Sequence, residues 1–112
     1  MQINEYQFKA LKTMNHELTY MEQLTNGLMG LNGEAGEAID ILKKHLWQGH
    51  ELDKEHLAKE LGDVAWYLAV SAFAIGYDLD TILEMNIEKL RERYNGGDFD
   101  SDLSVNRREG DI

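Results

Sequence analysis

Four acidic residues stand in two pairs, each with the spacing that makes side chains neighbours on a helix. The first pair is Glu34 and Glu37, and the second pair, after 22 intervening residues, is Glu60 and Asp63. Residues three apart share one side of a helix, so each pair can direct its oxygens towards one point. Four carboxylates at a common centre would repel one another and raise their pKa values unless a cation neutralised them. All-oxygen ligation suits a hard ion, so the spacing predicts Mg²⁺, with Mn²⁺ as its substitute.

Acidic pairs of this kind are also common on solvated helix faces, and the apolar pattern around them argues against that alternative. Glu34 lies at the edge of a predicted core stripe, and Glu60 borders a similar stripe. The first stripe consists of Leu28, Leu31, Ala35, Ala38, Ile39, Leu42 and Leu46. Glycines at 30, 33 and 36 cost roughly 1 kcal/mol each relative to alanine inside a helix. They indicate the close approach of a backbone or ligand, or else a break in the helix.

The elements that must position these acids are predicted to be helices. We expect them over about residues 3–12, 25–47, 54–75 and from 79 or 81 to 94, with a break over 13–19. Asp53 is the expected N-cap of the third helix, while Gly49 and Gly76 follow the second and third helices. Short connections favour an antiparallel arrangement, and no segment is typical of a strand. The predicted fold is therefore all-α, an antiparallel bundle of about four helices.

Length and composition exclude several classes of protein. A chain of 112 residues suits one domain, and its net charge of −10 argues against nucleic acid and anionic membrane as partners. The absence of cysteine excludes disulfide scaffolds, thiolate zinc sites and cysteine nucleophiles. The polar first residues argue against a secretory signal, and the uncharged stretch 64–76 is too short for a membrane span. We predict a cytoplasmic protein.

The third predicted helix carries apolar residues on almost every side between positions 64 and 75. A helix without a solvated face must be covered all round, which one short chain does with difficulty. We therefore expect self-association into a symmetric oligomer with this helix at its centre.

A set of polar residues on the fourth predicted helix complements the acids. Asn86, Lys89 and Arg93 share one face, which points towards the apolar stripe rather than away from it. Their role is either to bind a polyphosphate beside the acidic site or to extend along the edge of the core. Lys44 could add to a phosphate site, and Trp47 could stack on a base or simply pack at its helix end.

These residues together resemble the signature of MazG-like nucleoside triphosphate pyrophosphohydrolases. Residues 30–37 read GLNGEAGE, residues 60–68 read ELGDVAWYL and residues 86–94 read NIEKLRERY. The similarity covers roughly 25–97. It divides the chain into an all-α MazG-like domain over 1–97 and a C-terminal arm or disordered tail over 98–112. The family often has two adjacent glutamates at the start of its signature, where this chain has Gly33 and Glu34.

The resemblance implies an all-α enzyme, assembled as a dimer or a dimer of dimers. Such an enzyme hydrolyses a (deoxy)nucleoside triphosphate to the monophosphate and pyrophosphate with Mg²⁺, as in the clearing of nucleotide pools. Glu34, Glu37, Glu60 and Asp63 would be the metal ligands. The substrate-binding residues that the resemblance implies are Tyr67, Asn86, Lys89 and Arg93. From their own positions, Lys44 and Trp47 join the predicted substrate site, and Glu37 is the predicted general base because a carboxylate within reach of the attacking water can take its proton.

Two other functions stay open on the sequence alone. One is a dUTP- or phosphoribosyl-ATP-specific pyrophosphohydrolase on the same scaffold. The other is a non-catalytic helical oligomerisation module, in which the acids are charges at the rim of an interface.

Overall fold

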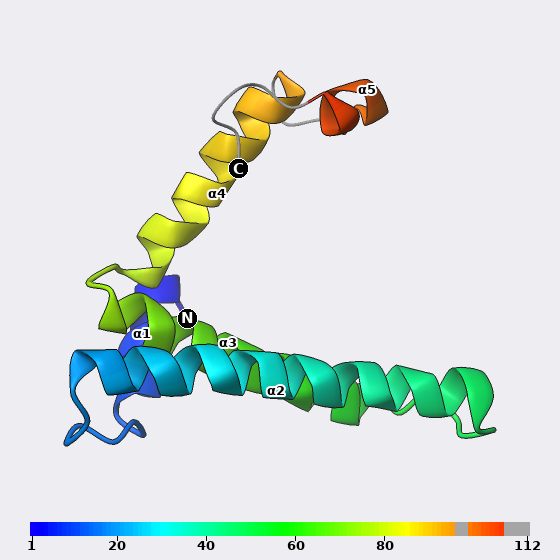
Figure 1. Cartoon of the computed structure of the whole chain (residues 1–112), viewed down its shortest axis with the longest axis horizontal. Coiled ribbons are helices and arrows are strands. Elements are labelled where there is room, and N and C mark those ends of the chain that lie inside the picture. Colours follow the sequence, from blue (N-terminus) through cyan, green and yellow to red (C-terminus); the bar gives the residue numbers. More distant parts are fainter. Residues whose placement is uncertain (96–98, 107–112) are drawn as a thin grey trace. The chain divides into compact units, whose positions relative to one another are not determined.

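The computed structural model describes residues 1–95 and 99–106. Its helices, coloured along the chain in Figure 1, are α1 (Ile3–Leu11), α2 (Tyr20–Trp47), α3 (Lys54–Ala74), α4 (Leu79–Tyr94) and α5 (Ser101–Val105). The described residues contain no strand, so the predicted all-α class is confirmed. Within this part of the chain, none of the helices combines the length and hydrophobicity that a membrane crossing requires.

The chain forms two units, residues 1–79 and 80–112, and each is described by itself. In the first unit α2 and α3 run antiparallel and pack along each other, as expected for consecutive helices with a short connection. Helix α1 also packs against α3. Helix α3 therefore receives cover from two elements of its own chain.

The ends of the helices follow local capping chemistry. Asp53 caps α3 as predicted, since its carboxylate accepts a hydrogen bond from the His56 backbone N–H at 3.0 Å. Helix α2 begins at Tyr20, five residues before the predicted start, and that boundary was wrong. The reason is a capping box, in which Thr19 and Glu22 each accept a hydrogen bond from the other's backbone N–H. Gly49 has a φ of +74°, which suits a glycine after a helix end.

The core of the first unit lies along the second half of α3. Ala69 and Val70 are fully buried there. Gln7 of α1 is buried beside them, and its amide makes three hydrogen bonds to the end of α3 and the segment that follows. The Gln7 Nε2 donates to the carbonyls of Ala69 and Tyr77, and the Leu79 N–H donates to Oε1. These bonds fix α1 across the end of α3.

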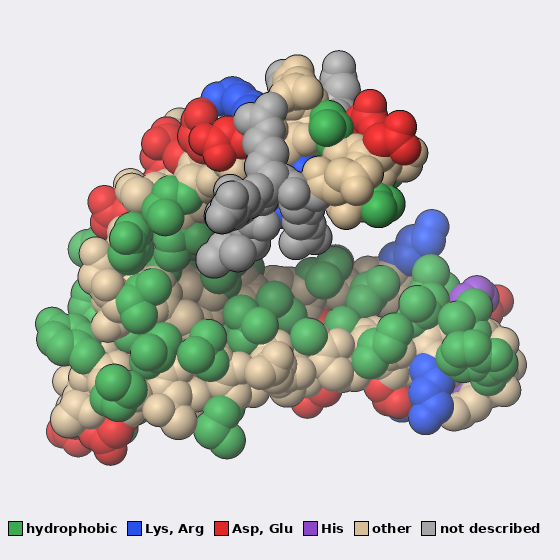
Figure 2. All heavy atoms as spheres, turned by 45° about the horizontal axis from the view of Figure 1, so that its top comes forward, with side chains coloured by type: hydrophobic (Ala, Val, Ile, Leu, Met, Phe, Trp, Pro, Cys, Tyr) green, Lys and Arg blue, Asp and Glu red, His purple; other side chains and the backbone are tan. Residues whose placement is uncertain are grey.

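The predicted core stripe of α2 is only partly buried in the single chain, where Leu31, Ala38 and Leu42 are half-buried. Leu28, Ile39 and Leu46 are each about half exposed or more, and Figure 2 shows hydrophobic side chains at the surface of this unit. The side of α2 that meets α3 instead carries small and polar residues, among them Gly27 and the buried Gln23. One helix can cover only one side of another, so the apolar stripe on the opposite side stays exposed.

The second unit contains α5, within the segment expected to be an arm or tail. Asp100 caps this short helix by accepting hydrogen bonds from the backbone N–H groups of Asp102 and Leu103. Residues 98 and 107–112 of the expected arm lie outside the described residues.

Candidate metal centre

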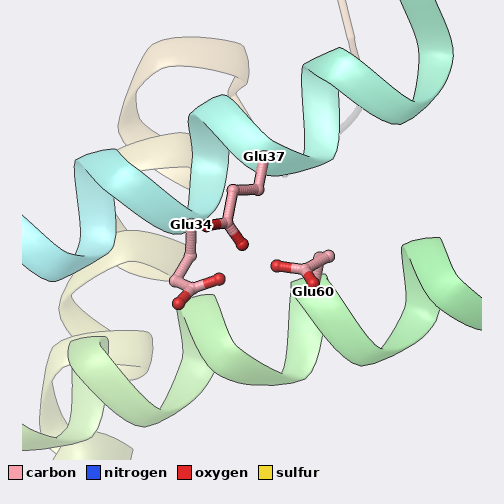
Figure 3. A group of neighbouring side chains, drawn as sticks. All are labelled: Glu34, Glu37 and Glu60. Atoms are coloured by element: carbon pink, nitrogen blue, oxygen red, sulfur yellow. The ribbon is translucent and has the colours of Figure 1, made fainter. Parts of the chain in front are cut away.

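Three of the four predicted metal ligands converge between α2 and α3. Glu34 and Glu37 extend from α2 and Glu60 extends from α3, with their carboxyl groups directed into the space between the helices (Figure 3). One carboxylate oxygen from each residue lies within 4.8 Å of the others. The i, i+3 spacing places the first two side by side, and the antiparallel packing of α2 on α3 adds the third. This arrangement can hold a small hard cation.

The burial of the oxygens supports a cation rather than a solvated acidic surface. Glu34 Oε2 and Glu60 Oε2 are buried, and no hydrogen-bond donor in the described part of the chain reaches them. The other oxygen of Glu60 lies 3.3 Å from Nε2 of His56. Buried acceptors are normally satisfied, so two orphaned carboxylate oxygens at one point indicate that a ligand is required there. An all-carboxylate set fits Mg²⁺ or Mn²⁺.

Without a cation, the neighbouring carboxyl groups share a proton. A hydrogen bond to Glu60, followed by burial and the negative charge of Glu37, raises the pKa of Glu34 to about 7. The same hydrogen bond lowers the pKa of Glu60, with help from Glu37 and His56. The pKa shifts therefore place a bound proton on Glu34 rather than on Glu60. This is the behaviour expected when like charges are held too close for both to ionise.

Asp63, the fourth predicted ligand, does not join this group. It is exposed and lines a pocket of about 310 Å³ with Glu34, Trp66 and Tyr67. Glu34 belongs both to the carboxylate group and to this pocket. The sequence predicted all four carboxylates at one centre, whereas the structure places three there and Asp63 in the adjoining pocket.

Tyr67 reaches the pocket because α2 has a glycine opposite it. A Cβ atom on Gly30 would lie 2.1 Å from Cε1 of the Tyr67 ring, so only glycine leaves room for the ring. The close neighbour at Gly30 is therefore a side chain and not the predicted backbone or ligand. At Gly33 and Gly36 an added Cβ would meet no atom of the described chain, and α2 continues through both, so the alternative of a helix break is wrong.

Trp66 also lines the pocket, although it was not among the site residues predicted from the sequence. The available signal was its spacing, because Trp66 and Tyr67 stand three and four positions after Asp63 and so share its side of α3.

The remaining predicted substrate residues lie elsewhere. Lys44 forms an exposed ion pair with Asp40 at 3.1 Å, and Trp47 is 76% exposed at the end of α2. Neither joins the carboxylate group. Helix α4, in the second unit, carries the other three predicted residues, Asn86, Lys89 and Arg93. Their contact with phosphate stays a prediction.

Comparison with known proteins agrees with this geometry. A model of the MazG nucleotide pyrophosphohydrolase domain matches residues 22–97, which contain Glu34, Glu37, Glu60 and Asp63. The chain is also 33% identical over 105 residues to the Gene 37 protein of Mycobacterium phage L5, covering 87% of this chain and 92% of that protein. No solved structure matches the chain significantly. Helix α1 lies before the matched segment.

Proposed function

Since the chain belongs to the MazG nucleotide pyrophosphohydrolase family, we propose that it hydrolyses nucleoside triphosphates to the monophosphate and pyrophosphate with Mg²⁺. The proposal rests on the convergence of the carboxylates of Glu34, Glu37 and Glu60. Two of their oxygens, one on Glu34 and one on Glu60, are buried without a hydrogen-bond donor. On a solvent-exposed acidic surface without a binding role, those oxygens would be hydrated. A site that binds a cation needs them free of protein donors.

The proposed ligands are the three converging glutamates, with Asp63 contributing from the adjoining pocket. When bound, the cation would neutralise phosphate charge and lower the pKa of a nearby water. Glu34 must give up its proton for this ligand set to form, because the protonated carboxyl group is a poor ligand.

Glu37 is the proposed general base. It is the exposed member of the group, so a water molecule can reach its carboxylate. As that water attacks the α-phosphorus, a bond forms between its oxygen and this phosphorus. The bond between the α-phosphorus and the α,β-bridging oxygen breaks. Glu37 takes the water proton, and pyrophosphate leaves. Asn86, Lys89 and Arg93 are the proposed contacts for the phosphate chain, as their side chains supply the donors that phosphate oxygens accept.

A product assay tests this function. The protein is incubated with Mg²⁺ and each canonical ribo- and deoxyribonucleoside triphosphate, with and without added inorganic pyrophosphatase. We expect equal amounts of monophosphate and pyrophosphate, with orthophosphate only when pyrophosphatase is added. Orthophosphate and a diphosphate product would instead mean attack at the γ-phosphorus. No turnover, together with no Mg²⁺ binding in calorimetry, would favour the helical oligomerisation module.

Adding dUTP and phosphoribosyl-ATP to the panel tests the narrower alternative. A strong bias towards dUTP, or activity on phosphoribosyl-ATP alone, would identify a specialised pyrophosphohydrolase with the same carboxylate chemistry.

A further inference from the structure

Residues 10–13 precede the segment that the family model matches, and they contact α3 at Trp66. Trp66 lines the pocket that also contains Glu34 and Asp63. The indole Nε1 of Trp66 donates hydrogen bonds to the Ala10 carbonyl at 3.1 Å and to Thr13 Oγ1 at 2.8 Å. The Thr13 hydroxyl in turn donates to the Ala10 carbonyl at 2.7 Å. Indole has one N–H donor, and both of its partners belong to the end of α1 and the residues after it. The orientation of the Trp66 ring is therefore set from outside the matched segment.

The ring held in this way forms one side of an aromatic corner. Trp66 and Tyr67 meet edge to face, with ring centroids 4.9 Å apart and planes at 88°. Tyr67 is itself fixed against Gly30 of α2. The two rings line the pocket that also contains Glu34 and Asp63. Two fixed aromatic faces beside a cation site match a ligand with a flat ring at one end and phosphates at the other.

Helix α1 approaches the same pocket through Tyr6. Its ring packs against the core cluster together with Trp66. Burial and then the negative charge of Asp63 raise the pKa of the Tyr6 phenol, which shows that α1 comes close to the acidic side of the pocket.

We propose that Trp66 is the surface on which the nucleobase of the substrate stacks, and that Thr13 and Ala10 position it. The inference rests on the proposed function and names one binding residue and two positioning residues for it. The N-terminal segment thereby becomes part of the substrate site. Stacking on an aromatic ring tolerates any base but favours the larger purines.

Steady-state kinetics provide the first test. With a purine nucleoside triphosphate, Trp66→Leu should raise KM about tenfold, the size expected for loss of one stacked base. The change in kcat should stay within about twofold, and Trp66→Phe should recover part of the affinity. Thr13→Val keeps the side-chain volume and should raise KM about threefold, because it removes the hydroxyl that accepts from Trp66 and donates to the Ala10 carbonyl. Thr25→Val is the matched control, because Thr25 makes a similar bond to the Met21 carbonyl on the exposed side of α2.

Fluorescence provides a test that does not depend on turnover. The chain has two tryptophans, Trp47 and Trp66. A nucleotide whose α,β-bridging oxygen is replaced by methylene is titrated into the wild type and into each tryptophan-to-phenylalanine variant, with Mg²⁺ present. We expect saturable quenching that persists in Trp47→Phe and disappears in Trp66→Phe. Quenching that follows Trp47 would overturn the inference.

The outcomes separate the two proposals. A wild type that releases no pyrophosphate contradicts the proposed function, whatever the tryptophan variants do. An active wild type whose KM is unchanged in Trp66→Leu and Thr13→Val contradicts this inference alone. Thermal denaturation of each variant then tests whether Trp66 has a purely structural role. An indole that only attaches α1 to α3 would alter the melting temperature and leave KM unchanged.

Discussion

At the residue scale, Glu34 and Glu60 are chemically identical groups with opposite pKa shifts. The hydrogen bond between them raises the pKa of Glu34 to about 7 and lowers that of Glu60. In the folded, metal-free protein Glu34 therefore holds its proton far above its ordinary value of 4.5. The folded state binds this proton more tightly than the unfolded chain, so the proton stabilises the fold. This stabilisation is complete below pH 4.5 and is lost as the pH rises to about 7.

We expect the melting temperature of the metal-free protein to fall between about pH 5 and pH 8. The Glu60 shift acts in the opposite direction, but its effect is confined to pH values below its ordinary pKa. Excess Mg²⁺ should remove the fall, since it replaces the proton at the carboxylates. Thermal denaturation in EDTA and in Mg²⁺ measures both curves. Glu34→Gln should flatten the metal-free curve, and an unchanged slope in that variant would contradict the assignment.

The acidic residues can be tested singly. Glu60→Gln and Asp63→Asn should each lower kcat by about 100-fold or more, the size typical for loss of one electrostatic contact to a transition state. The helical circular dichroism signal should persist, because each change keeps the side-chain shape. Glu55→Gln is the control, since Glu55 lies on the same helix in an exposed pair with Lys59. Unfolding of the first two variants would indicate a structural role instead.

At the element scale, the glycines of α2 differ although they look alike in the sequence. Gly30→Ala should lower stability by about 1–3 kcal/mol, because its Cβ would displace the Tyr67 ring. Gly33→Ala should raise stability by about 0.5–1 kcal/mol, because its Cβ meets open space and alanine favours the helix. Urea denaturation of both variants measures the difference. Equal effects would contradict the placement of Tyr67 on Gly30.

The buried amide of Gln7 is one of the groups that attach α1 to the rest of its unit. Gln7→Leu removes three hydrogen bonds and leaves the Leu79 N–H and two carbonyls without these partners. We expect a loss of about 3 kcal/mol in the free energy of unfolding, since buried polar groups left unsatisfied are costly. Gln48→Leu, at an exposed position after α2, should change stability by less than about 0.5 kcal/mol. If Gln7→Leu lowered the free energy of unfolding no more than Gln48→Leu does, the Gln7 hydrogen bonds would contribute little.

Helix positions and the carboxylate pairs could be predicted from sequence because both depend on local spacing. Asp53 as a cap and Glu34 beside Glu37 need only the geometry of one helix. The rest depends on packing between helices. The sequence alone could not tell that Tyr67 fills the space at Gly30, or that Asp63 falls outside the carboxylate group.

At the scale of the whole molecule, the apolar stripe of α2 indicates a partner. Met21, Leu28, Ile39 and Leu46 are exposed and recur at intervals of seven, eleven and seven residues. Seven and eleven residues are close to two and three turns of an α-helix, so these side chains share one face of α2. The stripe favours self-association through α2, whereas the sequence predicted an oligomer centred on the third helix, which α1 and α2 of the same chain already contact.

Self-association can be measured by sedimentation or light scattering. We expect a mass of two or four chains for the wild type, against 12.9 kDa for one. Ile39→Glu should shift the mass towards a single chain, because a charge buried in an apolar interface is strongly unfavourable. Gln48→Glu adds the same charge at an exposed position after α2 and should leave the mass unchanged. A wild type that stays monomeric at high concentration would contradict the prediction.

The attachment of α1 also bears on how this protein can change over generations. All three hydrogen bonds of Gln7 end on main-chain atoms, which every residue except proline supplies in full. Substitutions at Ala69, Tyr77 and Leu79 can therefore accumulate without removing a bonding partner, provided that the new side chains fit. Selection acts on one glutamine rather than on four positions together. The N-terminal helix can stay in place while the sequence beneath it drifts.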